Sequence, residues 1–170
     1  MTFKQFYAYL KVVLLHKRHV LTGCRRMRVP LWRGIIHDWD KFLPANFIAY
    51  ADNFYNPDGT KRCVRDASGA YDSNSQPQEF RLAWLNHQRN KHHWQAWISI
   101  GDGGNLEPLP MPEIYVLEMI ADWIGAGIAY SGLSNPFPWY AKNKDKMILH
   151  KDTENMLATK MVEFEIEVLE

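Results

Sequence analysis

Apolar residues recur three and four positions apart along most of the chain, which is the pattern of helices that bury one face. The pattern predicts long helices over five stretches: residues 2–23, 44–55, 78–98, 112–131 and 152–170. Shorter helical segments are expected just before His37 and after Asn135. Pro44 and Pro112 open two of the long stretches, and proline suits the first turn of a helix. We therefore predict an all-α fold, a bundle of about five to seven helices.

Two segments lack this periodicity and are expected to be loops. Asn56 to Gln78 begins with the turn sequence Asn-Pro-Asp-Gly and continues with glycine, serine, asparagine and proline. A long loop near 56–78 is uncommon in a compact domain, and it is either a lid or binding loop or a disordered insertion. Residues 100–111 contain several glycines and prolines and are expected to form a linker loop.

Length and composition narrow the class of protein. A chain of 170 residues is expected to fold as a single domain over residues 1–170. A content of 46% hydrophobic and 23% charged residues is typical of a globular protein. Cys24 and Cys63 are too few for a disulfide scaffold. No signal peptide is evident, and no apolar run approaches the roughly 20 residues of a membrane span, so we predict a cytoplasmic protein with no membrane contact.

The charge is nearly balanced overall but uneven along the chain. A net charge of +1 provides no global polycation for nucleic acid. Basic residues gather in the first predicted helix and just after it, and again in the loop near 56–78: Lys17, Arg18, Arg25, Arg26, Arg28, Lys61, Arg62 and Arg65. Such clusters are most often solvated surface, but either could touch a substrate phosphate, which leaves nucleic acid open as a partner.

The adjacent pair His37-Asp38 is the strongest chemical signal in the chain. It offers a neutral nitrogen and an anionic oxygen from consecutive residues, a combination suited to a borderline or hard divalent metal. Two ligands do not hold a metal, so the others must come from elsewhere. The candidates on both sides of the pair are His16, His19, His87, His92, His93 and Asp122.

The three histidines of the predicted helix 78–98 do not all lie on the same face of that helix. Residues three and four apart share a helix face, so His87 lies in line with Lys91, while Arg89 lies in line with His92 and His93. All three histidines therefore cannot reach one metal without a break in the helix. We expect one or two of them near the metal, and the remainder, with Arg89 or Lys91, at an anionic substrate.

Asp122 and His16 both lie close to the apolar face of a predicted helix. A buried carboxylate is costly unless it is paired or bound to a metal, so Asp122 is either a salt-bridge partner or a metal ligand. His16 follows Val12 and Val13 on the inward face of the first predicted helix. His19, one turn further on, is the alternative first ligand.

The order of His16, His37-Asp38 and Asp122 resembles the HD superfamily of metal-dependent phosphohydrolases, in which a histidine, a His-Asp pair and a later aspartate follow on successive helices. Lys41, three residues after Asp38, is similar to a lysine that often follows that pair. The resemblance implies an HD-like helical bundle with a divalent metal, one of Mn, Mg, Co, Ni, Zn or Fe, and allows two metals. The ligands that it implies are His16, His37, Asp38 and Asp122, with His87 and His93 as further ligands. The segments HDWDKF, NKHHW and ADW are also similar to a small family of bacterial and bacteriophage proteins, which implies no particular reaction.

The superfamily resemblance implies hydrolysis of a nucleotide or another small phosphate ester. The predicted catalytic residues are Asp38 as a metal ligand, Lys41 as a cationic donor to the phosphate, and Asp40 as a group that orients water or transfers a proton. The residues predicted to bind the substrate are Arg89, Lys91, His92 and Trp94, with the tryptophan available to stack on a base.

Two other functions fit the same residues. Some histidine-rich HD proteins are di-iron oxygenases, which this chain resembles in its extra histidines. The site could instead serve a non-catalytic protein that binds a nucleotide or a protein partner. The final helix could pack within the chain or form a subunit contact, which leaves a homo-oligomer open.

Overall fold

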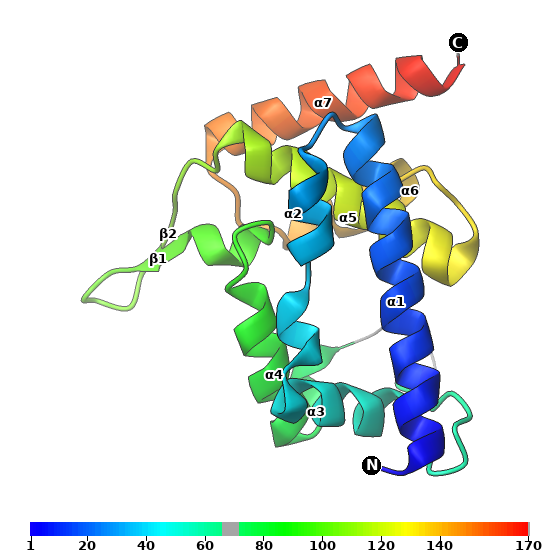
Figure 1. The fold of residues 1–170 in the computed structure, drawn as a ribbon. Coiled ribbons are helices and arrows are strands. Elements are labelled where there is room, and N and C mark those ends of the chain that lie inside the picture. Colours follow the sequence, from blue (N-terminus) through cyan, green and yellow to red (C-terminus); the bar gives the residue numbers. More distant parts are fainter. Residues whose placement is uncertain (66–71, 170) are drawn as a thin grey trace. The chain divides into compact units, whose positions relative to one another are not determined.

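A computed structural model gives the structure of residues 1–65 and 72–169 (Figure 1). Within these ranges it holds seven α-helices: α1 (Phe3–Arg26), α2 (Leu31–Ile36), α3 (Pro44–Phe54), α4 (Gln78–Gln88), α5 (Glu113–Ser131), α6 (Phe137–Asn143) and α7 (Lys151–Leu169). The sheet in this part of the chain is one antiparallel hairpin of β1 (Ile98–Ile100) and β2 (Leu106–Pro108). The predicted all-α fold is therefore confirmed. Among the described helices, none is both long and apolar enough to cross a membrane.

The predicted helix over residues 78–98 is too long, because α4 ends at Gln88. The chain turns after it, with the His93 amide donating to the Asn90 carbonyl at 2.9 Å, and the Trp97 indole N–H donating to the Lys91 carbonyl at 2.8 Å. A short 3-10 helix, η3 (Trp94–Trp97), then leads into β1. His87 therefore lies on α4, while His92 and His93 follow it and are not part of one continuous helix with His87.

The predicted loop over residues 100–111 was also partly wrong, because β2 lies within it. β1 and β2 pair over three residues each, from Ile98 opposite Pro108 to Ile100 opposite Leu106. Strands of this length are too short to show an alternating pattern in the sequence. The predicted loop near 56–78 does separate α3 from α4, with a turn at Asn56–Thr60 and a 3-10 turn at Ser73–Ser75. Its residues 66–71 lie outside the described part of the chain.

The chain forms two compact units, each with its own hydrophobic core. The first unit comprises Met1–Leu15 and Asp38–His87, and the second comprises His16–His37 and Gln88–Glu170. Neither unit is a continuous stretch of chain, and the single domain over residues 1–170 stays a prediction.

The core of the first unit is aromatic. Tyr9 from α1 meets Phe47 of α3 edge to face at 4.7 Å, and Tyr50 of α3 meets Phe80 of α4 in the same way at 5.1 Å. Such pairs contribute about 0.5–1.5 kcal/mol each beyond the area they bury. They pack α3 against α1 and α4. A short 3-10 helix, η1 (Trp39–Phe42), lies between Asp38 and α3.

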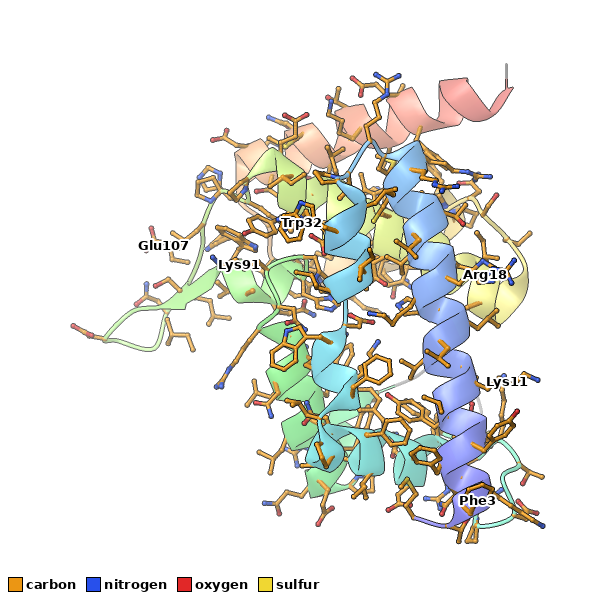
Figure 2. The ribbon with its side chains drawn as sticks, in the orientation of Figure 1. Phe3, Lys11, Arg18, Trp32, Lys91 and Glu107 are labelled. Atoms are coloured by element: carbon orange, nitrogen blue, oxygen red, sulfur yellow. The ribbon has the colours of Figure 1, made fainter. Side chains whose placement is uncertain are left out.

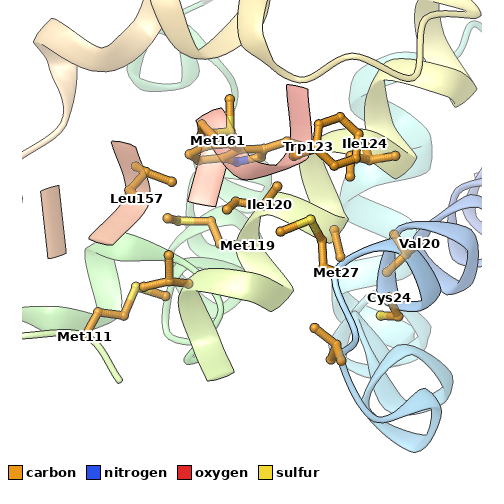
Figure 3. Close-up of a cluster of buried hydrophobic side chains, with 14 residues drawn as sticks. Val20, Cys24, Met27, Met111, Met119, Ile120, Trp123, Ile124, Leu157 and Met161 are labelled. Atoms are coloured by element: carbon orange, nitrogen blue, oxygen red, sulfur yellow. The ribbon is translucent and has the colours of Figure 1, made fainter. Parts of the chain in front are cut away.

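The core of the second unit is built around α5, as Figure 3 shows. The apolar positions of α5 spread around much of its surface, so this helix is covered on several sides. Met119, Ile120 and Ile124 of α5 are almost fully buried, and Leu157 and Met161 of α7 pack in the same cluster. α5 is therefore held in place by the core of this unit, and it carries part of the candidate site described below.

Glycines let the second half of α1 approach α5 closely. A Cβ atom added at Gly23 would collide with the carbonyl oxygen of Ala121, and one added at Gly125 would lie 2.7 Å from the backbone nitrogen of Val20. Both neighbours are backbone atoms, which cannot move away independently. Because Asp122 follows Ala121, this close crossing holds Asp122 against α1.

Gly23→Ala is expected to lower the free energy of unfolding by about 1 kcal/mol. Overpacking costs about 1–3 kcal/mol, and alanine regains about 1 kcal/mol through its better helix propensity. Urea unfolding would measure the change. Gly103→Ala is the control, because its added Cβ would have only the Asn105 side chain nearby, at 3.7 Å. Equal stability of the two variants would contradict the close crossing.

Candidate metal centre

His16 and His37 of the second unit converge on one carboxylate oxygen. The His16 Nε2 atom is 3.1 Å from Asp122 Oδ1, and the His37 Nε2 atom is 3.3 Å from the same oxygen. Both histidines are buried, and the Asp122 side chain is 13% exposed. Ligand atoms bound at about 2.0–2.2 Å in tetrahedral or octahedral geometry lie roughly 3.0–3.5 Å apart. These three donors therefore have the spacing of neighbouring ligands on one metal.

The charge state of Asp122 suits that role. Burial by itself raises the pKa of a carboxyl group, but the hydrogen bonds with His16 and His37 outweigh it and hold the pKa of Asp122 well below its ordinary value of 3.8. Asp122 is therefore a carboxylate at neutral pH, the form that binds a metal.

His37 is placed by the end of α2. Lys17 of α1 donates its Nζ protons to the carbonyls of Ile35, at 2.8 Å, and His37, at 2.6 Å. These carbonyls are at the helix C-terminus, where a cation is favourable. Residue type alone does not distinguish Lys17 from neighbouring surface cations such as Arg18, which is exposed on α1 (Figure 2).

Glu118 is a functional candidate that the sequence reasoning missed. Its Oε1 atom is 3.3 Å from His37 Nδ1 and 3.5 Å from His92 Nδ1, and its Oε2 atom accepts a 2.7 Å hydrogen bond from Arg33 Nε. Burial raises the pKa of Glu118, but the hydrogen bond with His37 and the nearby charges outweigh it and lower the pKa below 4.5. One signal was available, since Glu118 lies four residues before Asp122 and so on the same helix face.

The first unit holds its own cluster of ionisable groups, at the start of η1 and the end of α4. Asp38 has a left-handed backbone, with φ of 56°, and its Oδ2 atom pairs with Lys41 Nζ at 2.6 Å. His87 places Nδ1 3.1 Å from Asp40 Oδ2 and Nε2 3.8 Å from Asp38 Oδ1. Asp40 is fixed further by Asn46, whose Nδ2 donates to its carbonyl at 3.0 Å. A left-handed conformation away from glycine is a strained arrangement that is often found at functional sites.

His87 is electrically neutral in this cluster. Burial lowers its pKa, and the positive charge of Lys41 lowers it further, which together outweigh the opposing effect of Asp38 and Asp40. With Asp40 beside Nδ1, the Nε2 atom faces Asp38. A neutral imidazole oriented by a carboxylate can bind a metal or accept a proton.

The remaining predicted residues follow the break after α4. Arg89 and Lys91 are exposed, and Lys91 Nζ lies 5.9 Å from the ring centre of Tyr115 (Figure 2). His92 is buried, with its ring centre 4.0 Å from that of His37 and 4.4 Å from that of His93. Trp94 packs against the core of the second unit, and His19 is half-buried one turn after His16. Their predicted roles stay predictions.

Buried groups that could hold a metal ion are therefore present in both units. In the second unit they include His37, His92 and Glu118, in addition to the donors around Asp122. In the first unit they are Asp38, Asp40 and His87. Cys24 is not a comparable donor, because burial, reinforced by the charges of Glu118 and Asp122, raises the pKa of its thiol to about 11.

Comparison with known proteins gives one assignment. No curated protein and no solved structure shows significant similarity to the chain. One family model, described as a family of unknown function (DUF5662), matches residues 5–162. Because this match spans most of the sequence, the chain belongs to the DUF5662 family.

Proposed function

We propose that this protein is a metal-dependent phosphohydrolase that acts on a nucleotide or another small phosphate ester. The observation that carries the proposal is the convergence of two buried imidazole nitrogens, from His16 and His37, on one carboxylate oxygen of Asp122 at 3.1 and 3.3 Å. Two imidazole nitrogens and a carboxylate oxygen at this spacing are a mixed donor set suited to a divalent metal, which supports metal binding. The order of these residues in the sequence favours hydrolysis of a phosphate ester.

In this proposal His16, His37 and Asp122 hold a divalent metal, and Asp38 is predicted to add a fourth ligand. A bound metal would lower the pKa of a coordinated water and polarise a phosphoryl oxygen. Lys41 pairs with Asp38 at 2.6 Å and supplies positive charge for a phosphate. The exposed Arg89 and Lys91 are the predicted contacts of the substrate phosphate.

The pair of His87 and Asp40 is suited to moving a proton. His87 is neutral and can accept one at Nε2, and the Asp40 carboxylate beside Nδ1 stabilises the imidazolium that results. In the proposed function this pair, more than Asp40 alone, is the general base.

The test is metal analysis of the purified protein by mass spectrometry, joined to a phosphate-release screen over nucleotides with added Mn, Mg, Co, Ni, Zn or Fe. We expect bound metal, release from a subset of nucleotides, and loss of both metal and release in His37→Ala. Asp38→Ala is expected to abolish release. The matched control is His150→Ala, because His150 is partly exposed beside Asp152.

Other results of these two measurements would change or contradict the proposed function. Bound iron with oxygen consumption and no phosphate release would replace the hydrolase with an oxygenase. A protein that binds neither metal nor nucleotide would contradict the proposal, and nucleotide binding without metal or turnover would favour a binding protein. Unchanged metal content in Asp38→Ala would remove Asp38 from the ligand set and leave the cluster around Asp122.

A further inference from the structure

We propose that Glu118 is a positioning residue that orients the imidazole rings of both His37 and His92. The inference deepens the proposed function, on which it rests for its consequence at a metal. Glu118 is 4% exposed and lies on α5 one turn before Asp122. One face of this helix thus carries both the carboxylate predicted to bind the metal and the carboxylate that orients a ligand.

His37 lies between two carboxylates, one facing each ring nitrogen. Its Nδ1 atom lies 3.3 Å from Glu118 Oε1, and its Nε2 atom lies 3.3 Å from Asp122 Oδ1. A metal held by Nε2 and Asp122 would leave the imidazole hydrogen on Nδ1, where Glu118 accepts it. Glu118 therefore presents His37 in the form in which histidine binds a metal.

His92 is held by the same carboxylate oxygen. Its Nδ1 atom is 3.5 Å from Glu118 Oε1, and its ring lies over the His37 ring with centres 4.0 Å apart. Both imidazoles therefore turn Nδ1 toward Glu118 and Nε2 away from it. A change at Glu118 is expected to disturb the two rings together.

Arg33 argues against Glu118 as a metal ligand in its own right. Glu118, His37 and His92 are close enough to share a cation. However, Arg33 Nε donates to Glu118 Oε2 at 2.7 Å, and the guanidinium is held 4.5 Å from the ring centre of Tyr115. Oε2 is thus paired with Arg33, and Oε1 lies beside the Nδ1 atoms of His37 and His92, so both oxygens of Glu118 already have partners. Orientation of the histidines is the role that remains.

The first test is the affinity for Co²⁺ alone, measured by calorimetry and by the visible absorption of the bound ion. Glu118→Gln keeps the side-chain volume but replaces an anionic acceptor by an amide. Removing a partner that orients a metal-binding histidine typically lowers affinity about 10–100-fold, and we expect a loss in this range with an altered Co²⁺ spectrum. Glu113→Gln is the matched control, since it makes the same change on α5 at an exposed residue paired with Lys160. Equal affinities in the two variants would overturn the inference.

The second test needs no metal. In metal-free protein labelled with ¹⁵N-histidine, NMR is expected to show His92 protonated on Nδ1 in the wild type, and Glu118→Gln is expected to shift it toward a mixture of tautomers. A wild-type His92 protonated on Nε2 alone would overturn the inference. If the wild type binds no Co²⁺ at all, the proposed function fails, while the tautomer of His92 still decides the role of Glu118.

Discussion

Asp122→Asn is expected to abolish useful metal binding, with an affinity loss greater than the roughly 100-fold that marks the upper range for groups outside the ligand set. Asp122 is the point on which His16 and His37 converge, so its oxygen is the shared member of the proposed site. Asparagine keeps the shape but has no charge, and its amide can present N–H donors where a cation needs oxygen. Calorimetry with Co²⁺ and Mn²⁺ would measure the loss.

The same substitution is expected to weaken the metal-free fold. The hydrogen bonds of two buried histidines to a carboxylate would become bonds to a neutral amide, and bonds to charged groups contribute about 1.5–3 kcal/mol each. We expect a loss of about 2 kcal/mol in the free energy of unfolding, measured with urea in the presence of a chelator. Asp102→Asn, at an exposed turn of the hairpin, is the control. A variant that keeps both its metal affinity and its stability would show that Asp122 has neither role.

Periodicity predicted the long helices because most of them bury one face in a core. It placed the start of α3 at Pro44 and that of α4 at Gln78. It failed between Gln88 and Leu106, where the backbone is set by contacts such as that of the Trp97 indole with the Lys91 carbonyl. A hydrogen bond of this kind produces no periodic pattern of apolar residues in the sequence.

Part of the candidate site was predicted from the order of the motifs and not from periodicity. His16 and Asp122 are separated by more than a hundred residues, and the motif order alone put them together. The structure supplies the cause, since Gly23 and Gly125 let α1 and α5 approach until the two side chains meet. Those glycines were visible in the sequence, but their partners were not.

Glu118 and Lys17 could not be recognised by residue type. A charged residue on an amphipathic helix usually faces water, and only the position of Arg33, His37 and the end of α2 shows that these two do not. The left-handed backbone at Asp38 could likewise not be predicted from its residue type. The adjacency of His37 and Asp38 indicated chemistry, but it did not indicate that Asp38 would pair with Lys41 and face His87.

Acid is expected to destabilise the metal-free protein below about pH 6.5 through His87. The pKa of His87 is lowered on folding, mainly by burial, so between pH 6.5 and its folded pKa the unfolded chain binds the proton that the folded protein excludes. The free energy of unfolding therefore falls as the pH falls, by at most about 1.4 kcal/mol per pH unit for this one group. Asp122 and Glu118 also have lowered pKa values, but their contributions are lost only below their ordinary values of 3.8 and 4.5.

Between pH 7 and pH 5, the free energy of unfolding measured with urea is therefore expected to change through His87 and not through Asp122 or Glu118. His87→Gln can still donate to Asp40 but takes up no proton, so we expect its stability to fall less with pH than that of the wild type, by up to about 2 kcal/mol over this range. His150→Gln removes a partly exposed histidine and is expected to follow the wild-type curve. If His87→Gln loses stability with the wild-type slope, the folded protein accepts a proton on His87 as readily as the unfolded chain does. The conclusion that His87 is neutral and held by Asp40 would then be wrong. The assignment of His87 and Asp40 as the general base would be wrong with it.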